Sequence, residues 1–199
     1  PGRDAARKEA SKLNVPRIGV RFRLPASMNQ VEYFGRGPAE NYLDRNAGSM
    51  VGLYKSTAEE LYFPYVRPQE NGHHTDTRWV SLSTGKKGLL IQADNTIGFN
   101  ALRNSIEDFD DEEATGLSRQ WSNFTPEQVA NHDEAAAKNV LRRQHHINDI
   151  TPRDFVEVCV DLKQQGVAGY DSWGSRPEPA YTLPANREYN WGFTLIPLK

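Results

Sequence analysis

Residues 17–24 read Arg-Ile-Gly-Val-Arg-Phe-Arg-Leu, and this alternation decides the fold class. Ile18, Val20, Phe22 and Leu24 take every second position, with arginine or glycine between them. A period of two places all the apolar side chains on one face of a β-strand. The segment therefore predicts a strand with one buried face and one polar face.

Similar patterns follow along the chain. Short alternating or apolar runs predict further strands at residues 31–34, 78–82, 89–93, 96–102, 156–162 and 191–195. Residues 84–88 read Thr-Gly-Lys-Lys-Gly, which is typical of a hairpin turn. Strands at this spacing, separated by turn signals, predict a mainly β protein with the architecture of an antiparallel β-sandwich.

One helix interrupts the predicted strands. Residues 125–128 read Thr-Pro-Glu-Gln, which has the form of a capping box with proline at the first helical position. Arg142 and Arg143 suit the last turn, where cations oppose the negative end of the helix dipole. We therefore expect a helical excursion near residues 126–143. Residues 1–16 read as a linker or frayed segment, so the folded domain is expected over residues 17–199.

Composition excludes several classes of function. The formal net charge of the 199 residues is −2, which does not favour binding to nucleic acid or to an anionic membrane. The chain has no apolar run of about 18 residues that would predict a membrane span. Its single cysteine, Cys159, lies in a strand-like run and is expected to act as a small buried hydrophobe.

The histidines and acidic residues do not predict a metal site. Two adjacent pairs, His73-His74 and His145-His146, occur, but neighbours on a strand point to opposite faces and rarely bind one ion together. Residues 108–113 read Asp-Phe-Asp-Asp-Glu-Glu. A calcium site there is an alternative, but a solvated loop is favoured because the ligand spacing of calcium loops is absent.

The segment Gly169-Tyr170-Asp171-Ser172-Trp173-Gly174 stands out because its tryptophan lies between turn-forming residues. Glycine marks bends, and Asp and Ser bond nearby backbone groups. The pattern predicts a loop just past a strand, with Trp173 at the rim of the sheet. In that position the flat face of its ring is able to stack on the apolar face of a sugar. The alternative is that Trp173 folds back and fills the end of the core.

Three other segments carry unusual signatures. Residues 33–45 read Tyr-Phe-Gly-Arg-Gly-Pro-Ala-Glu-Asn-Tyr-Leu-Asp-Arg, residues 65–72 read Tyr-Val-Arg-Pro-Gln-Glu-Asn-Gly, and residues 77–79 read Thr-Arg-Trp. The charged residues of these segments, together with the adjacent Asp76, are expected to form structural Arg–carboxylate pairs rather than catalytic groups. They are Arg36, Glu40, Asp44, Arg45, Arg67, Glu70, Asp76 and Arg78.

In this order, and followed by Asp-Ser-Trp-Gly at residues 171–174, the segments resemble the C-terminal domain of glycoside hydrolase family 2 β-galactosidases. The resemblance runs from about Arg17 to Lys199. Two departures concern loops. Residues 168–171 read Ala-Gly-Tyr-Asp where the family has Gly-Gly-Asp-Asp, and His73 follows Asn71-Gly72.

The resemblance implies a fold and a role. The fold is a galactose mutarotase-like supersandwich, of which residues 17–199 are the C-terminal part. The parent enzyme hydrolyses terminal β-D-galactosides with two carboxylates about 5–5.5 Å apart. The resemblance places these carboxylates, and the magnesium of the family, in a separate TIM-barrel domain. No catalytic residue, metal or cofactor is therefore expected in this chain, and no activity is expected from it alone.

The resemblance also assigns site residues and partners. Trp173 stacks on the substrate, mainly on its aglycone side, while Asp171, Ser172 and Gly174 shape the loop. The implied partners are the β-galactoside and the TIM-barrel domain. Two alternatives stay open, namely a carbohydrate-binding module that uses Trp173, Trp79 and Trp191, and a mutarotase-like epimerase that needs a converging His and Glu. The compartment stays open between bacterial cytoplasm and periplasm.

Overall fold

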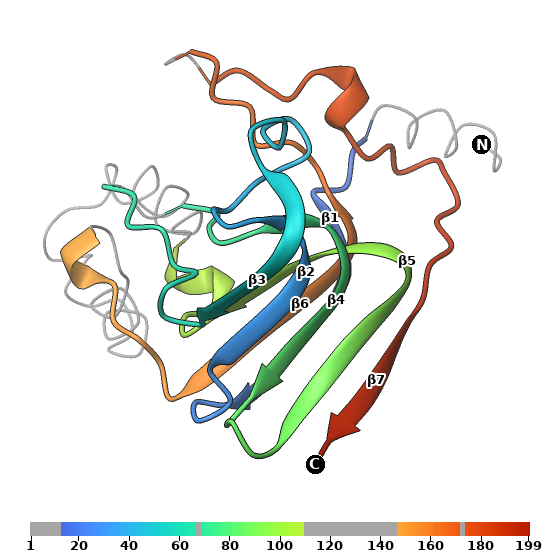
Figure 1. Ribbon diagram of the computed structural model, residues 1–199. Coiled ribbons are helices and arrows are strands. Elements are labelled where there is room, and N and C mark those ends of the chain that lie inside the picture. Colours follow the sequence, from blue (N-terminus) through green and yellow to red (C-terminus); the bar gives the residue numbers. More distant parts are fainter. Residues whose placement is uncertain (1–12, 67–68, 110–146, 172–173) are drawn as a thin grey trace, which may run out of the picture.

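The computed structural model describes residues 13–66, 69–109, 147–171 and 174–199 (Figure 1). Its strands are β1 (Arg17–Pro25), β2 (Gln30–Gly37), β3 (Met50–Thr57), β4 (His74–Ser83), β5 (Gly88–Leu102), β6 (Phe155–Gln164) and β7 (Phe193–Leu198). Within these residues the helical elements are three 3-10 turns: η1 (Ile106–Asp108), η2 (Ile147–Asp149) and η3 (Pro179–Tyr181). None of the helices in the described ranges is long and apolar enough to cross a membrane.

All seven strands belong to one antiparallel sheet. Six of them follow the order β1-β6-β5-β4-β2-β3, and β7 pairs with β5. Strand β5 is long enough to bind two strands along one edge, because Gly88–Ala93 pairs with β7 and Gly98–Leu102 pairs with β6. The chain is therefore mainly β, as its alternating pattern predicts.

The sheet is bent where β4 and β5 lose their regular register. The pairing passes from Trp79↔Gln92 to Thr77↔Ile97, so β5 carries extra residues there. On β4, Asp76 adopts a φ of 52°, a left-handed conformation that is uncommon outside glycine. Bulges of this kind bend a strand and increase its twist. Figure 1 shows the resulting curvature of β5.

The hydrophobic core lies on one face of this bent sheet. Its buried side chains come from β2, β4, β5 and β6 and include Val31, Tyr33, Val80, Leu82, Ile91, Ile97, Phe99, Val156, Val158 and Val160. Phe22 and Leu24 of β1 pack against the same cluster. Val20 stays 44 % exposed because β1 is an edge strand that pairs with β6 alone among the described strands.

The opposite face of β1 and β6 is polar, and its β6 carboxylates are buried beneath the arginines of β1. Glu157 lies on this face with its side chain 3 % exposed, and it binds Arg21 at 3.5 Å and Arg23 at 3.0 Å. Alternation in the sequence predicts the polar face correctly. It does not predict that β6 is buried on both sides.

Several predictions differ from the structure. Strand β3 is missing from the prediction. Its inward positions, Gly52, Tyr54 and Ser56, are only half-buried and mostly not apolar, whereas the apolar Leu53 is exposed, so the sequence shows no clear apolar face. Predicted strands 89–93 and 96–102 are a single strand. The predicted sandwich is not seen as two sheets in the described residues, because their strands form one.

Three further predictions fall partly or wholly outside the described residues. The predicted helix near 126–143 lies outside them, as do most of residues 1–16 and of the acidic run. Asp108, the first residue of that run, is buried and binds Arg153. This ion pair shows a structural role for Asp108.

Candidate functional site

The two longest sequence motifs meet at Glu40. This carboxylate accepts a hydrogen bond from the Gly72 N–H at 2.7 Å and another from Arg45 at 3.0 Å. It also accepts one from the Tyr65 hydroxyl. Its side chain is 7 % exposed. Glu40 therefore ties segment 33–45 to segment 65–72, as expected of a structural Arg–carboxylate pair.

Two asparagines reinforce this junction. The Asn41 side chain accepts hydrogen bonds from the Thr75 N–H at 2.9 Å and the Thr75 hydroxyl at 2.6 Å, and it donates to the Arg36 and Ala39 carbonyls. The Asn71 side chain bonds both backbone groups of Phe63. Buried amides with all their partners fix loop conformations.

Asp44 has a different role from the one its sequence predicts. It does not join an Arg–carboxylate pair among the described residues. Instead its two carboxylate oxygens accept backbone hydrogen bonds from Val167 at 3.1 Å and Ala168 at 2.8 Å. A Cβ at Gly166 would lie 2.4 Å from the same carboxylate, so this approach requires glycine.

The anchored backbone leads directly into the predicted loop. Ala168 and Gly169 have φ angles of 54° and 85°, so the chain turns sharply after the Asp44 contact. The Asp171 carboxylate then accepts a hydrogen bond from the Ser175 N–H at 3.3 Å, and Gly174 adopts a φ of 81°. Ser172 and Trp173 lie outside the described residues. The roles of Trp173, Asp171, Ser172 and Gly174 thus stay predictions.

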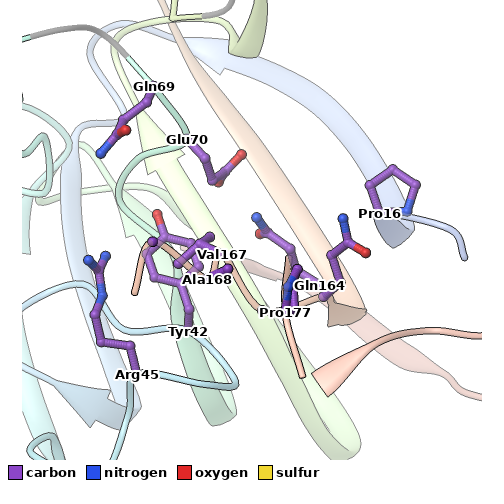
Figure 2. A pocket seen from close by; sticks show the side chains of 12 residues that line it. Pro16, Tyr42, Arg45, Gln69, Glu70, Gln164, Val167, Ala168 and Pro177 are labelled. Carbon is purple, nitrogen blue, oxygen red and sulfur yellow. The ribbon is translucent and has the colours of Figure 1, made fainter. Parts of the chain in front are cut away.

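A pocket of about 610 Å³ lies beside this anchor (Figure 2). Gln69 and Glu70 come from segment 65–72, which is the second motif, and Tyr42 and Arg45 come from segment 33–45, which is the first motif. Residues 166–169 belong to the stretch after β6 that leads into the predicted loop. Pro16, Gln164, Gln165 and Pro177 complete the lining. The strand ends and motifs therefore form one polar concavity.

A buried ionic cluster centred on Arg17 lies next to this pocket. The Arg17 guanidinium donates to Asn100 at 2.7 Å and to Gln164 at 2.6 Å, and it approaches Glu70 at 3.4 Å. Its Nε lies 3.0 Å from Asp161 Oδ2, but the two groups are not aligned as a hydrogen bond. Burial raises the pKa of Asp161 to about 7, although Arg17 acts to lower it. Alternation alone does not reveal this cluster.

The neighbouring histidines point to opposite faces, as predicted. His73 lies on the polar side, 2.8 Å from Asn100 and stacked on Tyr42, whereas His74 packs against Tyr33 and Phe99. Burial lowers the pKa of His73 to about 3 and that of His74 to about 4, so both rings are neutral at pH 7. His145 and His146 lie outside the described residues.

These histidines weaken the epimerase alternative. His73 and Glu70 both contact Asn100, but the His73 side chain is 2 % exposed. Such a ring cannot reach a sugar in the pocket. Cys159 is buried as predicted, but on this polar side rather than in the apolar core, and burial raises the pKa of its thiol to about 12. A protonated buried thiol does not act as a nucleophile.

The predicted tryptophan platforms of a binding module are not equivalent in the structure. Trp191 packs against the hydrophobic core and contacts Phe193, with ring centroids 5.4 Å apart. Trp79 is half-buried in β4, paired with Phe34 of β2. Core packing of Trp191 argues against a row of exposed rings.

The family model described as the β-galactosidase small chain matches residues 4–195. This match covers almost the whole chain. The chain belongs to the β-galactosidase small chain family. The motifs that meet at Glu40 and Asp44 are therefore part of a β-galactosidase small-chain domain.

Curated relatives are β-galactosidases. One from Priestia megaterium is 35 % identical over 185 residues, which are 92 % of this chain and 15 % of the relative. One from Arthrobacter sp. strain B7 is 40 % identical over 111 residues, 53 % of this chain and 11 % of the relative. One from Vibrio cholerae is 29 % identical over 181 residues, which are 91 % of this chain and 14 % of the relative. The chain thus spans about a seventh of the length of the relatives that it matches along most of its own length.

Proposed function

We propose that this chain is the non-catalytic C-terminal domain of a glycoside hydrolase family 2 β-galactosidase, and that it holds Trp173 against the substrate. The observation that carries the proposal is the Asp44 anchor, which fixes the backbone five residues before Trp173. A side chain that stacks on a sugar must be held in position by its loop. Fixing the loop from a buried motif supplies that precision.

The proposal includes the architecture of the whole domain. The sheet described above would form part of a galactose mutarotase-like sandwich. Its bent form and one-sided core support this, since sandwich sheets pack their apolar faces together. Further strands elsewhere in the parent protein would then cover its open edges.

The catalytic machinery is assigned to another part of the parent enzyme. Retaining hydrolysis needs one carboxylate as acid/base and one as nucleophile. In the proposal both belong to the TIM-barrel domain, as does the magnesium. The described residues include no group of three or more His, Cys, Asp or Glu side chains that could hold a metal ion. The carboxylates of the motifs bind arginines or backbone N–H groups instead.

The test is Trp173→Ala in the full-length enzyme that contains this chain. Stacking of one ring contributes roughly 1–3 kcal/mol, by comparison with bases stacked on aromatic residues. We expect KM to rise about ten- to a hundredfold for disaccharides, with a smaller rise for aryl galactosides. Trp173→Phe should recover part of the loss, because a ring face remains.

The control is the unfolding of the same variants. A rim tryptophan should cost the domain less than the roughly 3–5 kcal/mol expected for a fully packed one. The contrary result would be that Trp173→Ala unfolds the domain while any enzyme that remains folded keeps its KM. The side chain would then be packed in the hydrophobic core, and the proposal would be wrong.

A further inference from the structure

We propose that the pocket between segments 42–45, 69–70 and 164–169 is a binding site for a neutral saccharide unit. The proposal does not depend on Trp173 or on the loop after residue 171. It is argued from the described residues that line the cavity, and it would hold even if the tryptophan packed elsewhere.

The size of the pocket suits such a ligand. Its volume of about 610 Å³ falls within the usual range for small-molecule sites, about 300–1,000 Å³. Five of the twelve described residues that line it carry planar polar side chains: Arg45, Gln69, Glu70, Gln164 and Gln165. Each presents two polar atoms in one plane, which matches two neighbouring hydroxyl groups. Pro16 and Pro177 add apolar surface for C–H groups.

The charges around the pocket favour a neutral ligand. Arg45 is paired with Glu40 at 3.0 Å, and Arg17 is paired with Asp161 at 3.0 Å. Glu70 lies 3.4 Å from the same Arg17. Because each guanidinium already faces a carboxylate, an anion would gain little by entering. The lining offers both hydrogen-bond donors and acceptors, which suits hydroxyl groups because a hydroxyl group can both donate and accept.

Part of the lining is ready for a ligand. The side-chain amides of Gln69 and Gln165 bind no other described residue, although both line the pocket. They offer donors and acceptors that need not first break a protein contact. Gln164, by contrast, is engaged by Arg17 at 2.6 Å and helps to hold the wall.

The wall is fixed before any ligand arrives. The Gln165 N–H donates to the Pro16 carbonyl at 2.9 Å, and the Gly166 N–H donates to the Tyr181 carbonyl at 2.8 Å. Asp44 fixes the two residues that follow. A preformed site loses little conformational freedom on binding, which favours affinity for a small ligand.

The test is a titration of the chain with galactose, glucose and lactose, followed by ¹H–¹⁵N NMR. We expect saturable shifts of the backbone amides at residues 165–169, with a Kd of about 1 mM for a ligand of this size. Inorganic phosphate should cause no saturable shift at these amides. The double variant Gln69→Ala/Gln165→Ala should weaken saccharide binding about tenfold. The matched control Gln92→Ala, on exposed β5 surface, should leave the Kd unchanged.

Three results would overturn the proposal. They are the absence of saturable shifts with every sugar, equal binding by the double variant, and phosphate binding tighter than sugar binding, which would mark an anion site. Each would leave the proposed role of Trp173 intact, because that role is measured by KM in the full-length enzyme.

Discussion

At the residue scale, Asp44 is the side chain that couples the first motif to the loop. Its two backbone contacts are charge-assisted, and hydrogen bonds of this kind are worth about 1.5–3 kcal/mol each. Asparagine keeps one acceptor oxygen but presents an N–H₂ group to a backbone N–H. The geometry of residues 167–168 therefore depends on the carboxylate rather than on the size of the side chain.

We predict that Asp44→Asn in the full-length enzyme raises KM for lactose about threefold to thirtyfold, since half of the anchor is lost. The Tm of the enzyme should change little. Asp44→Ala should raise KM further. Steady-state kinetics with lactose and an aryl galactoside measure this. The control is Glu32→Gln, which removes the ion pair that Glu32 forms with Lys55 at 3.4 Å and should leave KM unchanged. An unchanged KM in a folded Asp44→Ala enzyme would show that the loop does not need the anchor.

Gly19 shows a second dependence on a single residue. A Cβ there would lie 2.0 Å from Asp161 Oδ1 and 2.5 Å from the Val160 carbonyl oxygen. The carboxylate could rotate away, but the backbone oxygen of a paired strand cannot. The missing side chain of Gly19 thus leaves the room that buried Asp161 occupies.

Gly19→Ala is therefore expected to destabilise the chain by about 1–3 kcal/mol, as overpacking does. Gly48→Ala is the matched control, because a Cβ at Gly48 meets nothing within 4 Å, and its effect should stay within about 0.5 kcal/mol. Urea unfolding of both variants measures the difference. Equal midpoints would mean that β1 and β6 separate easily at this position.

At the element scale, β6 is the strand whose environment is hardest to read from sequence. Val156, Val158 and Val160 alternate with polar residues, which predicts one solvated face. In the structure Glu157 and Asp161 are also buried, because arginines of β1 cover them. Alternation reports which residues share a face, but what covers the face is a tertiary fact.

The same limit explains the other elements. Strand β5 contains Asp94-Asn95, which read as turn formers, yet the strand continues through a bulge opposite Asp76. Strand β3 presents Leu53 to solvent and half-buries Tyr54, so its pattern is weak. By contrast, β1, β2, β4 and β6 follow their alternation closely enough to be predicted in place.

The burial of β6 has a pH signature. The folded-state pKa of Asp161 is about 7, above its ordinary value of 3.8, because burial disfavours the charged carboxylate more than Arg17 favours it. Between these pH values the folded chain binds more protons at Asp161 than the unfolded chain does. This group therefore lowers the unfolding free energy as pH rises from about 4 to about 7, and adds no further change above that range. His73 and His74, with lowered pKa values, act in the opposite sense.

Asp161→Asn isolates the effect, because the histidines remain in both proteins. The difference in unfolding free energy, variant minus parent, should increase as pH rises through this window, by up to about 1.4 kcal/mol per pH unit. Denaturant unfolding at several pH values measures it. A constant difference would mean that Asp161 is ionised throughout and that its pairing with Arg17 outweighs burial.

At the scale of the whole molecule, motif order is more informative than composition. Four short segments are enough to indicate the β-galactosidase relationship, and the family match over residues 4–195 agrees with it. The structure then shows why three of the segments occur together, since Glu40 joins the first to the second and Asp44 joins the first to the loop. The Arg17 cluster escapes the sequence because its members are far apart in the chain, with Arg17 and Asp161 on paired strands.

This organisation leads to a prediction about the chain by itself. The described carboxylates at the motif junction are engaged with arginines or backbone N–H groups, and Asp161 is nearly inaccessible, with its side chain 1 % exposed. Hydrolysis of a β-galactoside needs two carboxylates that both reach the glycosidic bond. The purified chain should therefore release no nitrophenol from an aryl β-galactoside above a blank. The full-length enzyme, assayed in parallel, should be active, so that a failed assay is recognised. Turnover that survives repeated purification and disappears in a Glu70→Gln variant would place a catalytic site in the pocket and overturn the assignment of a non-catalytic domain.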